Sequence, residues 1–168
     1  MSLYDTPEKY ALDQTPEELA IKLIREVPIV PGDSIYEPFK GEGSFYRNFP
    51  ADCITHWSEI KEGIDYKSFE DMVDWVITNP PYRMEEGKNC IIPLIFEFLP
   101  RVRKGIAFLC SDTIISSLTP LRREKIKALG FHVSKITIVN VKKWRGRYYF
   151  IQITKEENPS INYIMGNY

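Results

Sequence analysis

The chain has 168 residues, of which 43% are hydrophobic and 13% aromatic, and its formal net charge is -1. A chain of this length can bury a sufficient core as one unit, so we expect a single domain over 1–168 with no separate target-recognition domain. No apolar run is long enough to cross a bilayer and no signal-peptide pattern opens the chain, which predicts a cytoplasmic protein without membrane contact. Three widely spaced cysteines and two histidines favour neither a disulfide framework nor a metal site.

Helices and strands are predicted to alternate along the chain. The first helix should have Thr15 as its N-cap and Pro16 at its first position, and should end before Pro28. β-Branched and aromatic runs predict strands at 34–39, 53–57, 73–79, 105–110, 134–141 and 148–154. Further helices are predicted at 44–48, 69–72, 91–99 and 120–129. The last of these should have Thr119 as its N-cap and Gly130 just after its end. The alternation, closed by a hairpin, indicates an α/β fold with a mostly parallel sheet and one antiparallel strand.

A glycine-containing loop follows the first predicted strand. Open α/β sheets bind ligands where a strand turns into a helix, and Gly41 and Gly43 would let a ligand approach the backbone closely. Tyr46 stands where the dinucleotide fingerprint G-x-G-x-x-G needs its third glycine, so a nicotinamide oxidoreductase is the weakest candidate. The acid Glu37 would repel a pyrophosphate and attract an ammonium group. The loop therefore favours a cationic ligand over a phosphate.

Acidic residues also follow the second predicted strand. Glu59 is placed to accept hydrogen bonds from the two hydroxyls of a ribose. Ile60 could cover the face of a purine, and Asp65 could accept a hydrogen bond from an exocyclic amine. Each acid alone is more often a solvated loop residue. Their order after successive strands favours a nucleoside-binding role.

The tetrapeptide Asn79-Pro80-Pro81-Tyr82 ends the strand at 73–79. Proline lacks the N–H that would extend a sheet or a helix, so the strand should stop there in a rigid turn. The amide oxygen of Asn79 and the carbonyl of Pro80 can both accept hydrogen bonds from one planar NH2 group, and the Tyr82 ring can stack on the flat group that carries it. The pattern predicts a clamp for an amino group on a π-system. The simpler alternative is a strand-ending turn without chemistry.

Basic residues are concentrated in one part of the chain. The segment from Arg101 to Arg147 holds twelve basic and two acidic residues, a net charge of +10. This imbalance predicts one face that contacts nucleic acid. In the hairpin loop, Trp144 would either stack on a base or anchor the loop in the core. The predicted nucleic-acid contacts of this loop are Lys142, Lys143, Trp144, Arg145 and Arg147.

With these motifs in their order, the chain resembles the S-adenosylmethionine-dependent amino-methyltransferases, particularly the adenine-N6 DNA methyltransferases in which the cofactor motif precedes the catalytic one. The resemblance spans 14–155 and implies a Rossmann-like methyltransferase fold, with a mostly parallel seven-stranded sheet and an antiparallel strand in the terminal hairpin. Lys40 departs from the small residue usual in the methionine-binding loop. The implied catalytic residues are Asn79, Pro80, Pro81 and Tyr82. The implied cofactor contacts are Thr15, Pro16, Glu37, Pro38, Phe39, Gly41, Gly43, Glu59, Ile60, Asp65, Tyr66 and Asn79.

The resemblance implies methyl transfer from S-adenosylmethionine to the N6 amine of adenine in DNA. Three alternatives stay open: adenine in RNA, a glutamine side-chain amide in protein, and a non-catalytic cofactor-binding subunit of a larger nucleic-acid-modifying complex. No segment is long enough to form a target-recognition domain. We therefore expect that the protein reads little sequence, that a partner subunit or a second copy reads it, or that the substrate is not duplex DNA.

Overall fold

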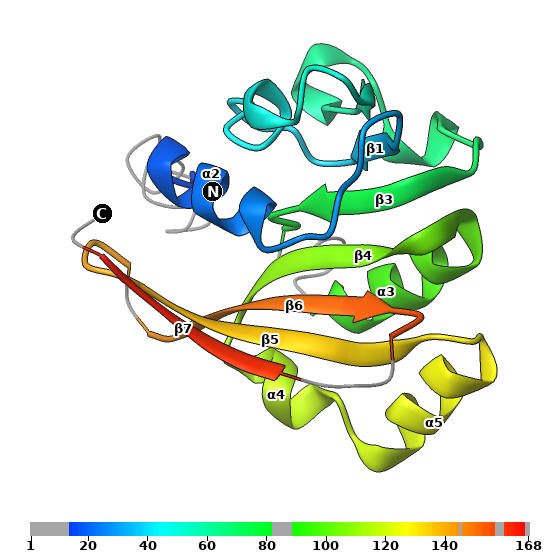
Figure 1. The fold of residues 1–168 in the computed structure, drawn as a ribbon, viewed down its shortest axis with the longest axis vertical. Coiled ribbons are helices and arrows are strands. Elements are labelled where there is room, and N and C mark those ends of the chain that lie inside the picture. Colours follow the sequence, from blue (N-terminus) through cyan, green and yellow to red (C-terminus); the bar gives the residue numbers. More distant parts are fainter. Residues whose placement is uncertain (1–13, 82–88, 145, 157–159, 167–168) are drawn as a thin grey trace, which may run out of the picture.

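A mixed β-sheet forms the centre of the protein in the computed structural model, which describes residues 14–81, 89–144, 146–156 and, by their backbone, 160–166 (Figure 1). Its strand order is β2-β1-β3-β4-β6-β5-β7. β6 runs antiparallel to its neighbours β4 and β5, whereas all other neighbouring strands are parallel. The strands are Ser34–Glu37 (β1), Ile54–Trp57 (β2), Val73–Thr78 (β3), Val102–Ser111 (β4), His132–Val141 (β5), Tyr148–Thr154 (β6) and Ser160–Gly166 (β7).

Helices cover both faces of the sheet. Within the described residues, no helix is both long and apolar enough to span a membrane. The α-helices are Glu17–Arg25 (α2), Ile91–Phe98 (α3), Thr113–Ser117 (α4) and Pro120–Ala128 (α5). Short 3-10 helices lie at Tyr46–Asn48, Ile60–Glu62, Tyr66–Ser68 and Leu99–Arg101.

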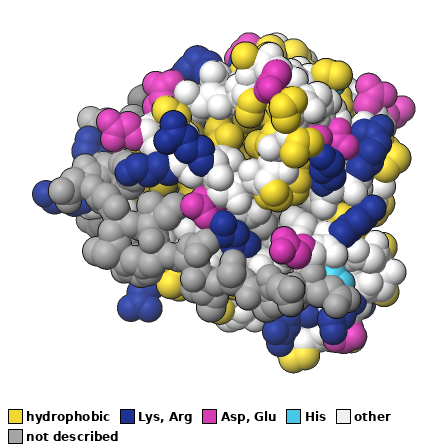
Figure 2. Space-filling view, viewed as in Figure 1, with side chains coloured by type: hydrophobic (Ala, Val, Ile, Leu, Met, Phe, Trp, Pro, Cys, Tyr) yellow, Lys and Arg dark blue, Asp and Glu magenta, His cyan; other side chains and the backbone are white. Residues whose placement is uncertain are grey.

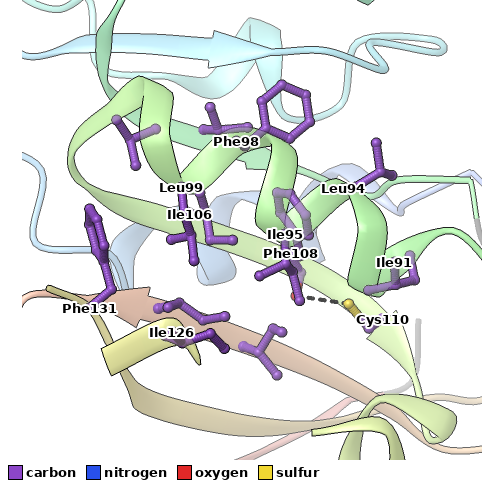
Figure 3. Packing of buried hydrophobic residues seen from close by; sticks show 14 of the residues in the cluster. Ile91, Leu94, Ile95, Phe98, Leu99, Ile106, Phe108, Cys110, Ile126 and Phe131 are labelled. Carbon is purple, nitrogen blue, oxygen red and sulfur yellow. Dashed lines mark hydrogen bonds between the residues drawn. The ribbon is translucent and has the colours of Figure 1, made fainter. Parts of the chain in front are cut away.

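Two hydrophobic clusters lie on opposite faces because successive strand residues point to opposite sides of the sheet. On one face, α3 packs Ile95 and Phe98 against strand residues such as Phe108, and α4 and α5 continue this layer (Figure 3). The Sγ–H of Cys110 in β4 donates to the backbone oxygen of Phe108 at 3.7 Å beneath these side chains. On the other face, the apolar side of α2 packs with Trp75 of β3 and with the segment before β2. The central strands β3 and β4 are thereby covered on both sides.

The structure confirms the mostly parallel sheet with one antiparallel strand and the hairpin between β5 and β6, but several local predictions are wrong. α2 spans nine residues, and its N-cap is Pro16, not Thr15. The Thr15 hydroxyl accepts a hydrogen bond from Asn79 instead. The helix predicted at 69–72 is absent. The Phe69 side chain instead stacks on the ring of Tyr36, with ring centroids 4.0 Å apart, and the backbone there is not helical. The predicted helix at 44–48 is a 3-10 turn. α4 was not predicted, and no residue range was predicted for β7.

An ion pair between a buried carboxylate and a partly exposed lysine joins the beginnings of β1 and β4. Asp33, 5% exposed, accepts a hydrogen bond from Lys104 Nζ at 2.5 Å and from Trp75 Nε1 at 2.9 Å. The backbone N–H of Val30 donates to the same carboxylate at 3.1 Å. Burial alone would raise the pKa of Asp33, but the bonds from Lys104, Val30 and Trp75 outweigh it and lower the pKa. The carboxylate is therefore a stabilising group of the fold.

The Asp33→Asn variant should unfold at lower denaturant concentration than the wild type, with a loss of about 1–3 kcal/mol, because Lys104 and the surrounding donors lose a charged acceptor. Since the pKa of Asp33 is lowered in the fold, its contribution is present at neutral pH and is lost as the pH falls through the folded-state pKa. Urea unfolding at neutral and acidic pH measures both effects. The matched control is Asp52→Asn at an exposed acid. Equal losses in the two variants would contradict the assignment.

Candidate active site at the ends of strands β1 and β3

The proposed site lies where the connections of the sheet diverge. β1 has β2 on one side and β3 on the other, so the chain leaves β1 in one direction and returns past it to β3. In open α/β sheets such a switch point leaves a crevice beyond the carboxyl ends of the two strands, and ligands bind there. β1 ends at Glu37 and β3 ends at Thr78, next to Asn79. The topology thus brings the two sequence motifs to one edge of the sheet.

Glu37 has one unused buried oxygen at this edge. The residue is 2% exposed, and its Oε2 has no hydrogen-bond partner among the residues that the structure describes. Burial raises the pKa of the carboxyl well above its usual range, and the backbone N–H of Tyr46 and the charge of Lys40 offset this only in part. A buried acceptor without a partner is costly unless a ligand supplies the missing donor. An ammonium group is a suitable donor.

The glycines of the loop after β1 are required by its backbone. Gly41 has φ +54° and Gly43 has φ +83°, a region that side-chain-bearing residues rarely adopt. The turn directs the N–H of Gly41 to Glu59 Oε2 at 2.7 Å, and the N–H of Lys61 donates to Oε1 of the same carboxylate at 3.1 Å. Each oxygen of Glu59 therefore keeps capacity for a further donor. The loops after β1 and β2 are joined through this one side chain.

Lys40, which departs from the residue usual in this loop, is held by the β2 side of the site. Its ammonium lies 3.5 Å from the centre of the Trp57 ring and 2.5 Å from Glu62 Oε1. The side chain of Lys40 is 16% exposed. Lys40 thus adds a second link between the loops that follow β1 and β2.

The remaining predicted cofactor residues differ in exposure. Ile60 is 69% exposed, so its side chain is accessible to a ligand. Asp65 is exposed and accepts from the N–H of Lys67 at 3.0 Å. Tyr66 is 8% exposed and packs in the core against Phe39, with ring centroids 5.0 Å apart. A cofactor contact by Tyr66 stays a prediction and would have to use the small exposed part of that residue.

Asn79 is fixed from the N-terminal side of the chain. Its Nδ2 donates to the Thr15 hydroxyl oxygen at 3.1 Å, although the two residues are 64 positions apart. Thr15 is 6% exposed, and Asn79 is half-buried. Pro16 and Pro81 are also half-buried, whereas Pro38 and Pro80 are buried. The structure therefore brings the Thr15-Pro16 motif into direct contact with the Asn79 motif.

Cys90 holds the far end of the proline turn. Its Sγ–H donates to the carbonyl oxygen of Pro81 at 2.7 Å, and Cys90 is 8% exposed at the start of α3. In the sequence, Cys90 is one of three widely spaced cysteines, a pattern that gave no signal of this contact. Tyr82, predicted to stack on the target, lies outside the described residues.

The basic segment does not form a single face. Near the opposite edge of the sheet, Lys104, Arg103 and Lys135 pair with acids at 2.5, 3.8 and 2.5 Å. Figure 2 likewise shows basic side chains scattered among acidic ones over the visible face. A cavity of about 390 Å³ between α4, α5 and β5 is lined in part by Arg123 and Lys127, but by none of the predicted site residues. The described basic residues of this segment are therefore divided between opposite edges of the sheet, and a face that contacts nucleic acid stays a prediction.

The hairpin loop lies at the same edge of the sheet as Asn79, because β5 runs parallel to β3. Three strand spacings, roughly 14 Å, separate β5 from β3. Lys142, Lys143 and Arg147 are exposed, whereas Arg145 lies outside the described residues. Trp144 is half-buried, packs against the α2-side cluster and lies 4.6 Å from the Tyr148 ring centroid. This packing favours the core-anchor alternative for Trp144.

Comparison with solved structures shows that the chain has the fold of S-adenosylmethionine-dependent methyltransferases. It aligns over 89% of its length with lmo1582 of Listeria monocytogenes, proposed to be a class I S-adenosylmethionine-dependent methyltransferase, at TM-score 0.63 and 16% identity. It aligns over 86% with a type I restriction-modification methyltransferase subunit from Streptococcus thermophilus, at TM-score 0.58 and 13% identity. The third structure is magnesium protoporphyrin IX methyltransferase from Synechocystis PCC 6803 with bound S-adenosylmethionine, which aligns over 93% at TM-score 0.57 and 11% identity.

These similarities concern the fold and not the sequence. The chain spans 65% of the Listeria protein, 44% of the Streptococcus subunit and 85% of the Synechocystis enzyme. No protein-family model matches the sequence, and neither does any curated protein. The substrate class therefore has to be inferred from the residues of the site.

Proposed function

We propose that this protein transfers a methyl group from S-adenosylmethionine to the exocyclic N6 amine of adenine in DNA. One observation carries the proposal: Asn79, in the clamp tetrapeptide, lies at the same sheet edge as the buried carboxylate of Glu37, whose Oε2 has no hydrogen-bond partner among the described residues. Those two groups suit a planar amine and a ligand ammonium, respectively. The similarity in fold to S-adenosylmethionine-dependent enzymes supports the same cofactor.

The residues present fit S-adenosylmethionine. Glu37 Oε2 would accept from the amino-acid ammonium, and the backbone of the Gly41–Gly43 loop would lie against the methionine part. Glu59 would accept from the ribose hydroxyls with its remaining lone pairs, and Ile60 would cover the adenine. When bound, the cofactor supplies an electrophilic methyl group attached to a sulfonium.

The clamp would activate and aim the acceptor amine. An aryl amine is a weak nucleophile because its lone pair is delocalised into the ring. Hydrogen bonds from its two N–H groups to Asn79 Oδ1 and the Pro80 carbonyl would localise that lone pair and direct it. Tyr82 would stack on the extruded or single-stranded base. The amine would itself be the nucleophile: its nitrogen would bond to the methyl carbon as the carbon–sulfur bond breaks, S-adenosylhomocysteine would leave, and the surplus N–H proton would pass to water. No nucleophilic side chain is therefore needed, and positioning would supply much of the rate.

The substrate class is tested by incubating the protein with methyl-labelled S-adenosylmethionine and a panel of duplex DNA, single-stranded DNA, RNA and protein, followed by identification of the modified residue. We expect N6-methyladenine in DNA. Label in RNA adenine alone, or in a protein glutamine alone, would replace the DNA assignment by that alternative. An absence of label in every substrate, with the cofactor bound, would favour the non-catalytic alternative. The likeness to a restriction-modification subunit supports a partner subunit or a second copy that reads the target sequence.

Charge reversal in the hairpin, Lys142→Glu with Lys143→Glu, should weaken DNA binding and reduce the slope of affinity against salt concentration, because fewer counterions are released. Fluorescence anisotropy across a salt series measures both quantities. Arg123→Glu with Lys125→Glu on α5 is the matched control, since it makes the same charge change at exposed positions away from the site edge. Unchanged affinity in the hairpin variant, or equal losses in both, would remove the hairpin from the interface.

A further inference from the structure

The side chain of Asn79 has little intrinsic preference for the plane of its amide. The terminal torsion of asparagine is broad and roughly two-fold, so the residue alone does not determine where its oxygen points. A clamp that accepts hydrogen bonds from an amine needs the amide oxygen, and not the NH2 group, directed at the target. Some neighbouring group must therefore select the orientation.

Thr15 is placed to make that selection. Its hydroxyl oxygen accepts from Asn79 Nδ2 at 3.1 Å, so the NH2 end of the amide is turned towards Thr15. Because the oxygen and nitrogen of an amide occupy opposite branches of one plane, Oδ1 points away from Thr15. The contact is part-buried, since Thr15 is 6% exposed and Asn79 is half-buried.

The threonine is held by a rigid element. The carbonyl of Pro16, the next residue, accepts from the N–H of Ala20 at 3.0 Å, which closes the first turn of α2. Leu19 and Leu23 of the same helix are fully buried against the sheet. Moving Thr15 would require moving a packed helix. The hydroxyl therefore offers a fixed point against which the Asn79 amide is oriented.

We propose that Thr15 is a positioning residue for methyl transfer: its hydroxyl holds the Asn79 amide with Oδ1 directed at the target amine. This role differs from the cofactor contact that the sequence resemblance implies for Thr15. The inference rests on the proposed function for its kinetic consequence. The orientation of the amide itself does not depend on that function.

Thr15→Val and Thr15→Ser separate the hydroxyl from the shape of the residue. Valine keeps the size and branching of threonine without a hydrogen-bonding group, whereas serine keeps the hydroxyl. With single-stranded DNA and labelled S-adenosylmethionine, we expect kcat to fall about tenfold in Thr15→Val, the value of one hydrogen bond, and to be largely retained in Thr15→Ser. The dissociation constant for S-adenosylmethionine, measured by calorimetry, should stay unchanged in both variants.

Three results of these assays would contradict a positioning role for Thr15. Unchanged kcat in Thr15→Val, or weaker cofactor binding as the main effect, would overturn the proposal in favour of a cofactor contact. An equal loss in Thr15→Ser would show that the hydroxyl is not what matters, and it would also overturn the proposal. If the wild type methylates no substrate, the orientation is still tested by NMR. The side-chain NH2 signals of Asn79 should exchange with solvent faster in Thr15→Val than in the wild type, and equal rates would overturn the proposal independently of the function.

Discussion

Methyl transfer by the Asn79→Ala variant should fall by at least about a hundredfold, the usual cost of losing one preorganised polar group that acts on the reacting centre. Alanine removes the acceptor that would localise the amine lone pair, and it leaves the Pro80 carbonyl as half of a clamp. The affinity for S-adenosylmethionine should change little, because the carboxylate proposed to hold the cofactor ammonium belongs to Glu37 on a different strand. Single-turnover assays measure the transfer rate, and calorimetry measures the affinity.

Two further variants make the result specific. Asn48→Ala removes another half-buried amide, which donates to the Ser44 carbonyl at 2.8 Å, and it should leave the transfer rate unchanged. Asn79→Asp keeps an acceptor oxygen but loses the NH2 group that donates to Thr15, so its rate should lie between those of the wild type and Asn79→Ala. A rate for Asn79→Ala within a few-fold of the wild type would reject the clamp and leave the tetrapeptide as a strand-ending turn.

Predictions from local pattern held where neighbours in sequence determine the conformation. The run Val73–Thr78 is a strand, and Thr119 caps α5 by accepting from the N–H of Arg122 at 3.4 Å. Gly130 follows that helix with φ +82°, as a helix C-terminus often requires. These features need only a few adjacent residues, so the sequence was sufficient to predict them.

Predictions failed where distant residues compete for a side chain. Thr15 would have been an ordinary N-cap, but Asn79, 64 positions away, uses its hydroxyl instead. Likewise Phe69 stacks on Tyr36 of β1 and is drawn out of the expected helix. The segment from Arg101 to Arg147 is rich in basic residues, yet Lys104 and Lys142 lie at opposite edges of the sheet because each parallel strand crosses the whole sheet. Sequence proximity does not imply a shared surface in an α/β fold.

Glu37→Gln should have opposite effects on cofactor affinity and on the stability of the cofactor-free protein. Glutamine keeps the size of the side chain but cannot become an anion. The dissociation constant for S-adenosylmethionine should rise by roughly ten- to a hundredfold, the value of a charge-assisted hydrogen bond. Burial raises the pKa of Glu37 in the free protein, so the neutral acid is the form that the fold favours. The Glu37→Gln variant, which is neutral at every pH, should therefore be more stable than the wild type at a pH where the wild-type carboxyl is ionised.

For an acid with a raised folded-state pKa, the favourable contribution is present at low pH and is lost as the pH rises through that pKa. Above it, Glu37 is a buried anion whose Oε2 lacks a partner among the described residues, and the neutral glutamine should therefore increase the free energy of unfolding.

A ligand ammonium favours the anion, so cofactor binding should release a proton below the folded-state pKa, and affinity should rise with pH up to it. Calorimetry in buffers of different ionisation enthalpy counts the protons. Glu18→Gln at an exposed acid on α2 is the control. A wild-type affinity independent of pH, or a destabilised Glu37→Gln protein, would show that this carboxylate does not await a cationic ligand.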